Sequence, residues 1–174
     1  MEPAGLNPLE LMLEVIEQNT PQTIWTGAPL ESFRRVANTN RGDIGEEFIR
    51  RFLSQHGFSV SDRISRVSRA DMEIAGRRFE VKTASEDRSG SFQFNHVRLD
   101  RMYDYLLCVG VRPASIMFNA WGRGEVSEGR AGTLVRMAEG QSVTFKLTKR
   151  PDGMLPIEEL PYWIQRNISN PLAG

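Results

Sequence analysis

The chain has 174 residues, the length of one ordinary domain, and its 22 Lys and Arg residues are balanced by 22 Asp and Glu. Its composition, with 40% hydrophobic and 25% charged residues, is that of a soluble globular protein and excludes the disordered, fibrous and membrane-spanning classes. A single cysteine, Cys108, excludes a disulfide framework and a cysteine-based zinc site, so we expect a cytoplasmic protein. No apolar run approaches the length of a membrane span, so we expect no membrane partner.

Helical signals come first along the chain. Asn7 followed by Pro8 is typical of a helix start, and apolar residues then recur at helical spacing. A glycine at position 57 is typical of a helix end. We therefore expect helices over residues 8–19, near 30–36 within a packed connector at 20–40, and from 43 or 44 to 56.

From residue 58 the apolar pattern changes to a period of two, which predicts strands. We expect strands at 59–62, 69–74, 78–83, 105–111 and 115–120, a hairpin of 133–137 with 142–147, and a terminal helix over 157–166. The run 105–111 is apolar throughout, so it is expected at the centre of a sheet. Residues 97–104 are interpreted as a helical turn or short helix. With no repeat or linker, the pattern predicts one domain of the α/β (α+β) class.

Residues 69–82 alternate on both sides of a short turn at 75–76, which predicts a β-hairpin. If Ile74 pairs with Arg77, one face of the hairpin is apolar and the other is charged. Slipping the register by one residue would mix the two faces, so the pattern favours this register.

In this register two carboxylates, Asp71 and Glu80, lie opposite each other, which destabilises a sheet unless a cation compensates. A hard divalent cation held by carboxylates and waters would compensate. Lys82 follows on the same face, where an ammonium can orient a water or neutralise charge on phosphorus. A purely structural alternative is a solvated face with cross-strand ion pairs; it explains Glu73 beside Arg78 but not Asp71 opposite Glu80.

These residues resemble the PD-(D/E)xK nucleases, which include many type II restriction endonucleases and the archaeal Holliday-junction resolvases. The family has an Asp on one strand and a Glu-x-Lys on the next, matched here by Asp71 and by Glu80 with Lys82. Its acidic residue on a preceding helix is matched by Glu46 in a Gly-x-x-x-Glu pattern. The resemblance extends over residues 41–111.

The resemblance implies a restriction-endonuclease-like core, in which helices flank a central mixed β-sheet, and a Mg²⁺-dependent endodeoxyribonuclease activity. It implies that Asp71, Glu80 and the Val81 carbonyl hold the Mg²⁺, for which Mn²⁺ substitutes, and that Lys82 positions the attacking water. Glu46 is expected to bind a second metal ion or to act on the first through its outer shell. We expect a single nuclease domain over 1–174, with an N-terminal helix and connector at 1–40, the catalytic core at 41–120, and a hairpin and helix at 121–174.

The leading functional hypothesis is a type II-like restriction endonuclease that cuts double-stranded DNA as a homodimer, with or without a separate specificity subunit. The alternatives are a structure-specific or repair nuclease that resembles the junction resolvases, and a non-catalytic DNA-binding module on the same fold. DNA contacts are expected from a loop that carries Gln93, Asn95, His96 and Arg98. Residues 34–101 contain fourteen basic and ten acidic side chains, so the neutral total includes a basic region suited to a polyanion.

Overall fold

The central sheet of this computed structural model, which describes residues 7–62, 71–137 and 141–169, has six strands in the order β1-β2-β3-β5-β6-β9. Their bounds are β1 Val60–Asp62, β2 Met72–Ile74, β3 Arg77–Ser85, β5 Tyr105–Val111, β6 Ile116–Gly122 and β9 Leu155–Pro156. β3 and β5 run parallel, whereas the other neighbouring strands are antiparallel. The predicted α+β class with a central mixed sheet is therefore confirmed.

A second sheet in the described part of the chain has three antiparallel strands in the order β4-β8-β7. Their bounds are β4 Phe92–Val97, β7 Leu134–Met137 and β8 Thr144–Lys149. The hairpin of β7 and β8 was predicted, but β4 was interpreted as a loop, and that interpretation was wrong. Its alternation breaks at an irregularity between Phe94 and Val97, where His96 has a φ of 56°. Residues 98–104 form no helix, contrary to the expectation.

The helices are α1 Pro8–Asn19, α2 Glu31–Arg35, α3 Asn38–Gln55, α4 Arg123–Ser127 and α5 Leu160–Ile164. α1 and α2 lie where they were predicted, but α3 begins five residues before the predicted start. The terminal helix is divided into a 3-10 turn at Ile157–Glu159, α5 and a π-helical turn at Gln165–Ser169. None of the described helices is long and apolar enough to cross a membrane.

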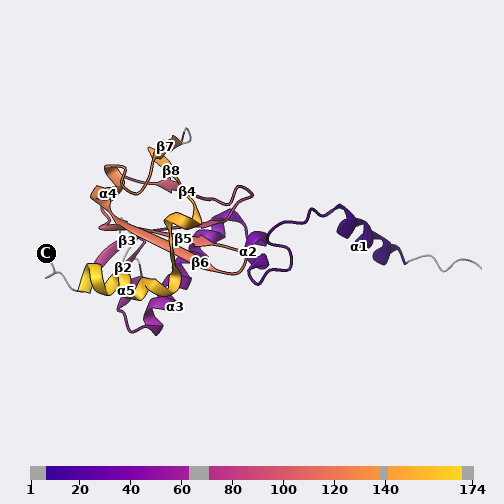
Figure 1. Cartoon of the computed structure of the whole chain (residues 1–174), viewed down its shortest axis with the longest axis horizontal. Helices are drawn as coiled ribbons and strands as arrows, with labels where there is room; N and C mark the ends of the chain where they lie inside the picture. Colours follow the sequence, from indigo (N-terminus) through magenta and orange to yellow (C-terminus); the bar gives the residue numbers. More distant parts are fainter. Residues whose placement is uncertain (1–6, 63–70, 138–140, 170–174) are drawn as a thin grey trace, which may run out of the picture.

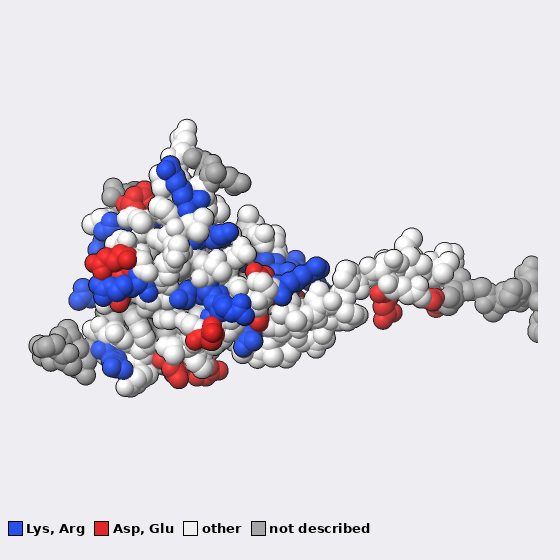
Figure 2. Space-filling model, turned by 45° about the horizontal axis from the view of Figure 1, so that its top comes forward, with Lys and Arg blue, Asp and Glu red and all other residues white. Residues whose placement is uncertain are grey.

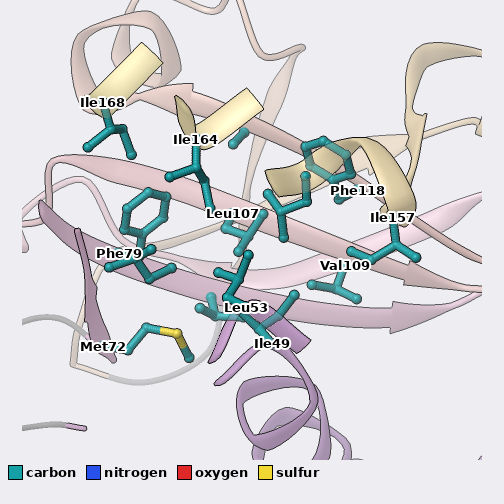
Figure 3. Packing of buried hydrophobic residues seen from close by; sticks show 14 residues of the cluster. Ile49, Leu53, Met72, Phe79, Leu107, Val109, Phe118, Ile157, Ile164 and Ile168 are labelled. Carbon is teal, nitrogen blue, oxygen red and sulfur yellow. The ribbon is translucent and has the colours of Figure 1, made fainter. Parts of the chain in front are cut away.

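Helices cover one face of the six-stranded sheet (Figure 3). Ile49 and Leu53 of α3 and Ile164 near the C-terminus pack there against Phe79 and Leu107, and all five side chains are fully buried. Because side chains alternate along a strand, the next residues of β3 and β5 point to the opposite face. The apolar face predicted for the 69–82 hairpin is thus a core face over the described residues Met72, Ile74, Phe79 and Val81.

The three-stranded sheet covers the opposite face, where Phe92 and Phe94 of β4 pack in one cluster with Leu106 and Cys108 of β5. Cys108 is fully buried, as predicted, and burial raises the pKa of its thiol. Figure 1 shows these layers and shows α1 standing apart from them. Every residue of α1 is exposed, so this helix adds nothing to either core.

The position of α3 depends on one glycine. A Cβ atom at Gly45 would lie 1.8 Å from Oγ1 of Thr83 on β3, so only a residue without a side chain allows the helix to lie this close. Glu46 is the next residue, so this close approach also determines where its carboxylate lies relative to β3.

Gly45→Ala is expected to destabilise the fold by about 1–3 kcal/mol because the new methyl group forces α3 away from Thr83. Gly42→Ala is a matched control in the same helix, since its Cβ would meet nothing within 4 Å. It should be neutral or stabilise the helix by up to about 1 kcal/mol. Chemical denaturation measures both; equal stability of the two variants contradicts the close-packing argument.

Candidate active site

A cleft of about 650 Å³ lies between the N-terminal half of α3, the second half of β3, and β4. From the predicted catalytic set, Glu46, Asp71, Val81 and Lys82 line it. From the predicted DNA-contacting set, Gln93, Asn95 and His96 line it. The fold thus brings most of both sets to one cavity, although they were inferred from separate segments of the sequence; Glu80 and Arg98 do not line it.

Asp71 lies just before the first residue of β2. The predicted register is confirmed from Ile74 opposite Arg77 to Met72 opposite Phe79, where the ladder ends. The backbone N–H of Asp71 donates to the Phe79 carbonyl at 2.9 Å. The alternation predicted that Asp71 pairs with Glu80 in the ladder, but the two residues are not regular ladder partners. Residues 69–70 of the predicted strand lie outside the described residues.

The side chain of Asp71 explains why the ladder ends there. Its Oδ2 accepts a hydrogen bond from the backbone N–H of Val81 at 2.8 Å. The Val81 N–H thus donates to a side-chain carboxylate instead of to a backbone carbonyl of a neighbouring strand. The bond fixes Asp71 to the residue between Glu80 and Lys82, so all three functional groups of the motif meet within one short length of β3.

The surroundings of Asp71 disfavour its ionised form. Burial raises the pKa of Asp71, and the charge of Glu80 raises it further. The Val81 N–H and the charges of Lys82 and Arg101 act in the opposite direction but do not cancel the effect. A cation bound beside Asp71 would favour its ionised form, so this environment is suited to a cation.

Glu80 has no exposed surface and lies beneath the cleft rather than on its wall. Its carboxylate is held between two cations: Nζ of Lys82 lies 2.9 Å from Oε1, and Nη1 of Arg101 lies 3.3 Å from Oε2. The protein thus supplies part of the positive charge near the two carboxylates that was expected from a metal ion.

The buried hydroxyl of Tyr103 has no hydrogen-bond partner within the described residues. Burial, followed by the charge of Glu80, raises the pKa of this hydroxyl to about 12.

Arg101 was missed by the sequence analysis as a residue of this site. It comes from the irregular segment 98–104, and no motif or periodicity links it to a carboxylate 21 positions earlier in the chain.

Arg78 was expected to form an ion pair with Glu73, but it forms one with Asp104 instead. Nη2 of Arg78 lies 3.2 Å from Oδ1 of Asp104, while Glu73 and Arg78 remain opposite each other in the ladder.

The predicted DNA-contacting residues divide into two groups. Gln93, Asn95 and His96 are exposed on the cleft side of β4, and Nε2 of Gln93 donates to Oδ2 of Asp87 at 3.3 Å. Arg98 is not part of the cleft lining, and its guanidinium binds the carboxylate of Asp100. The structure therefore separates Arg98 from the other three.

The metal-ligand set that the resemblance implied, Asp71, Glu80, Val81 and Glu46, stays a prediction. Among the described residues no three His, Cys, Asp or Glu side chains form a group that could hold an ion together. Asp71 and Glu80 are a pair, and Glu46 lines the cleft without completing a triad. Mg²⁺ needs only one or two carboxylates when waters and substrate oxygens complete its octahedron, so the pair still fits such an ion.

The chain matches no protein-family model and no curated protein. Among solved structures it is similar to a bacterial homing endonuclease, with a TM-score of 0.44 and 12% sequence identity. The similar region covers 66% of this chain and 75% of that one.

Asp71→Asn is expected to raise the melting temperature at neutral pH. The amide oxygen can still accept the Val81 N–H, while the charge that burial and Glu80 disfavour is removed. Because the folded-state pKa of Asp71 is raised, the wild type loses stability as pH rises through that pKa. The advantage of the variant should therefore shrink under acidic conditions, where Asp71 is protonated. Melting curves across pH measure this, and a variant less stable than the wild type at neutral pH contradicts it.

Arg101→Ala is expected to cost about 1–3 kcal/mol because the buried Glu80 carboxylate would keep Lys82 as its one remaining ion-pair partner among the described residues. The control is Arg130→Ala, which removes an exposed ion pair with Glu128 and should change stability by about 0–1 kcal/mol. Urea denaturation compares the two. Losses of the same small size would mean that Arg101 does not stabilise Glu80.

Proposed function

We propose that this protein is a divalent-cation-dependent endonuclease that hydrolyses phosphodiester bonds in double-stranded DNA, and that Asp71, Glu80 and Lys82 form its reactive centre. One observation carries the proposal: the Asp71 side chain is hydrogen-bonded to the backbone between Glu80 and Lys82, at the wall of a cleft. Asp71 and Lys82 are thus held at the cleft, where a substrate can reach them, with the buried Glu80 carboxylate directly beneath.

Each group has a role that follows from its surroundings. Asp71, which lines the cleft, and Glu80 beneath it supply the carboxylate oxygens for a cation. A bound Mg²⁺ or Mn²⁺ polarises the phosphoryl oxygens and lowers the pKa of a coordinated water. Lys82 is 19% exposed and is held by Glu80, so its ammonium can orient the water and neutralise charge on the phosphoryl group.

The reaction that these groups would promote is a hydrolysis. The water oxygen forms a bond to phosphorus, one P–O ester bond breaks, and the leaving oxygen gains a proton as the water loses one. Glu46, placed on the cleft wall by α3, is positioned to act on a second ion or on waters of the first. These steps need the Lys82 ammonium and an ionised Asp71 together.

The opposite wall of the cleft is suited to recognition rather than chemistry. Gln93, Asn95 and His96 present amide and imidazole groups from β4, and such groups can donate and accept hydrogen bonds to base edges. A restriction-type enzyme would use this wall to read a sequence and would pair two chains to cut both strands. A structure-specific nuclease would use the same chemistry on branched DNA.

The purified protein is expected to cut DNA in the presence of Mg²⁺ or Mn²⁺, and the cleavage is expected to stop when EDTA is added. Asp71→Asn and Lys82→Met should each lower the rate by about 100-fold or more because each removes a group that stabilises the transition state. Glu73→Gln is the matched control: it neutralises a carboxylate of β2 that does not line the cleft. Its rate should equal that of the wild type.

The substrates are phage DNA, a supercoiled plasmid and a four-way junction, with melting curves to show that every variant is folded. Discrete fragments of phage DNA would indicate a restriction-type enzyme, and selective cutting of the junction would indicate a structure-specific one. Wild-type rates in the Asp71 variant would overturn the assigned centre. If none of the three DNA substrates is cut in the presence of metal, the proposed activity fails and the non-catalytic DNA-binding module is favoured.

A further inference from the structure

Two arginines are linked to each other and to β3: Arg41 lines the cleft, and Arg34 lines a neighbouring pocket that also contains Glu86 and Asp87. Nη2 of Arg41, in α3, donates to the backbone carbonyl of Arg34, in α2, at 2.9 Å. Nη1 of Arg34 donates to Oγ of Ser85, in β3, at 2.9 Å. Ser85 and Arg41 both line the cleft that contains Lys82. The pair is thus attached to the same strand as the proposed reactive centre.

Neither guanidinium has an acidic partner among the described residues. Instead each lies over an aromatic ring, Arg34 at 5.8 Å from the centroid of Trp25 and Arg41 at 5.6 Å from that of Phe33. Such rings hold the guanidinium plane without neutralising its charge. The next residue in α2, Arg35, differs in this respect because it pairs with Glu31 at 3.4 Å.

The two positive charges disfavour each other. Burial and the charge of Arg34 lower the pKa of Arg41, and its Nε is buried with no hydrogen-bond partner in the described part of the chain. An anion placed between the guanidinium groups would offset this cost and accept charge-assisted hydrogen bonds. The first turn of α3, which has no side-chain N-cap and no acidic residue, also lines the cleft.

Lys82 and Ser85 point to opposite faces of β3 but both line the cleft, and the distance between them is within the span of a few nucleotides of a nucleic-acid backbone. Ser85 lies three residues beyond Lys82, a distance of about 10 Å at the rise of a β-strand. Successive phosphates of one DNA strand rise by about 3.4 Å each along the helix axis. A strand whose reacting phosphate lies at Lys82 therefore has another phosphate, a few nucleotides away, within the region of Arg34 and Arg41.

We propose that Arg34 and Arg41 bind a backbone phosphate of the DNA strand that is cut at Lys82, and so determine how that strand lies in the cleft. This inference rests on the proposed nuclease function. In Figure 2, basic side chains are spread over the viewed face of the body with acidic ones among them, whereas the charged side chains of α1 are all acidic. The body, not the α1 arm, is thus the part of the chain suited to a polyanion.

The test measures binding of a labelled DNA duplex by fluorescence anisotropy over a range of salt concentrations. The protein is the full chain carrying Asp71→Asn, in EDTA, so that no strand is cut. Adding Arg34→Gln or Arg41→Gln should weaken binding about tenfold and reduce the salt slope by about one, as expected for the loss of a phosphate contact. Arg35→Gln, the control, should leave the slope unchanged. Arg41→Lys should recover most of the slope because it keeps the charge.

The outcomes separate the two proposals. If the parent protein binds the duplex but Arg34→Gln and Arg41→Gln behave like Arg35→Gln, the phosphate site is overturned and the nuclease function stands. If the parent protein binds no duplex or branched DNA at low salt, the proposed function fails and the phosphate site with it. If inorganic phosphate binds as tightly as the duplex, the arginines serve a free anion instead. Melting curves show whether each variant is folded.

Discussion

The burial of Glu80 is the constraint around which the site is arranged. A carboxylate with no exposed surface must be balanced by nearby cations, and here Lys82 and Arg101 lie at hydrogen-bond or ion-pair distance from its two oxygens. A second carboxylate, Asp71, lies close enough for Glu80 to raise its pKa. A carboxylate with a raised pKa in a cleft, such as Asp71, is typical of functional sites.

The rest of the fold gives this charge cluster an accessible wall. α3 lies directly on β3 because Gly45 has no side chain, which brings the Glu46 carboxylate to the cleft from the helical layer. The three-stranded sheet packs on the opposite face and supplies the polar residues of β4 as the facing wall. One face of the central sheet therefore supports the helices, and the other supports the three-stranded sheet, and both layers contribute residues to the cleft.

The sequence was sufficient for features that alternation enforces. The register of β2 with β3 and the buried position of Cys108 could be predicted because any other placement mixes charged and apolar faces. Three other features depend on contacts that the periodic pattern of apolar and polar residues does not predict. The Asp71 side chain replaces a ladder bond, a positive φ at His96 interrupts β4, and Arg101 reaches Glu80 from an irregular segment.

The central claim is that Asp71 and Glu80 hold a divalent cation. Electron paramagnetic resonance of Mn²⁺ tests it most directly, because free and bound Mn²⁺ give different signals and no DNA is needed. Titrating Mn²⁺ into the full chain should show binding that is competed by Mg²⁺ and lost in Asp71→Asn but kept in Glu73→Gln. Equal Mn²⁺ binding by the wild type and Asp71→Asn would contradict the claim.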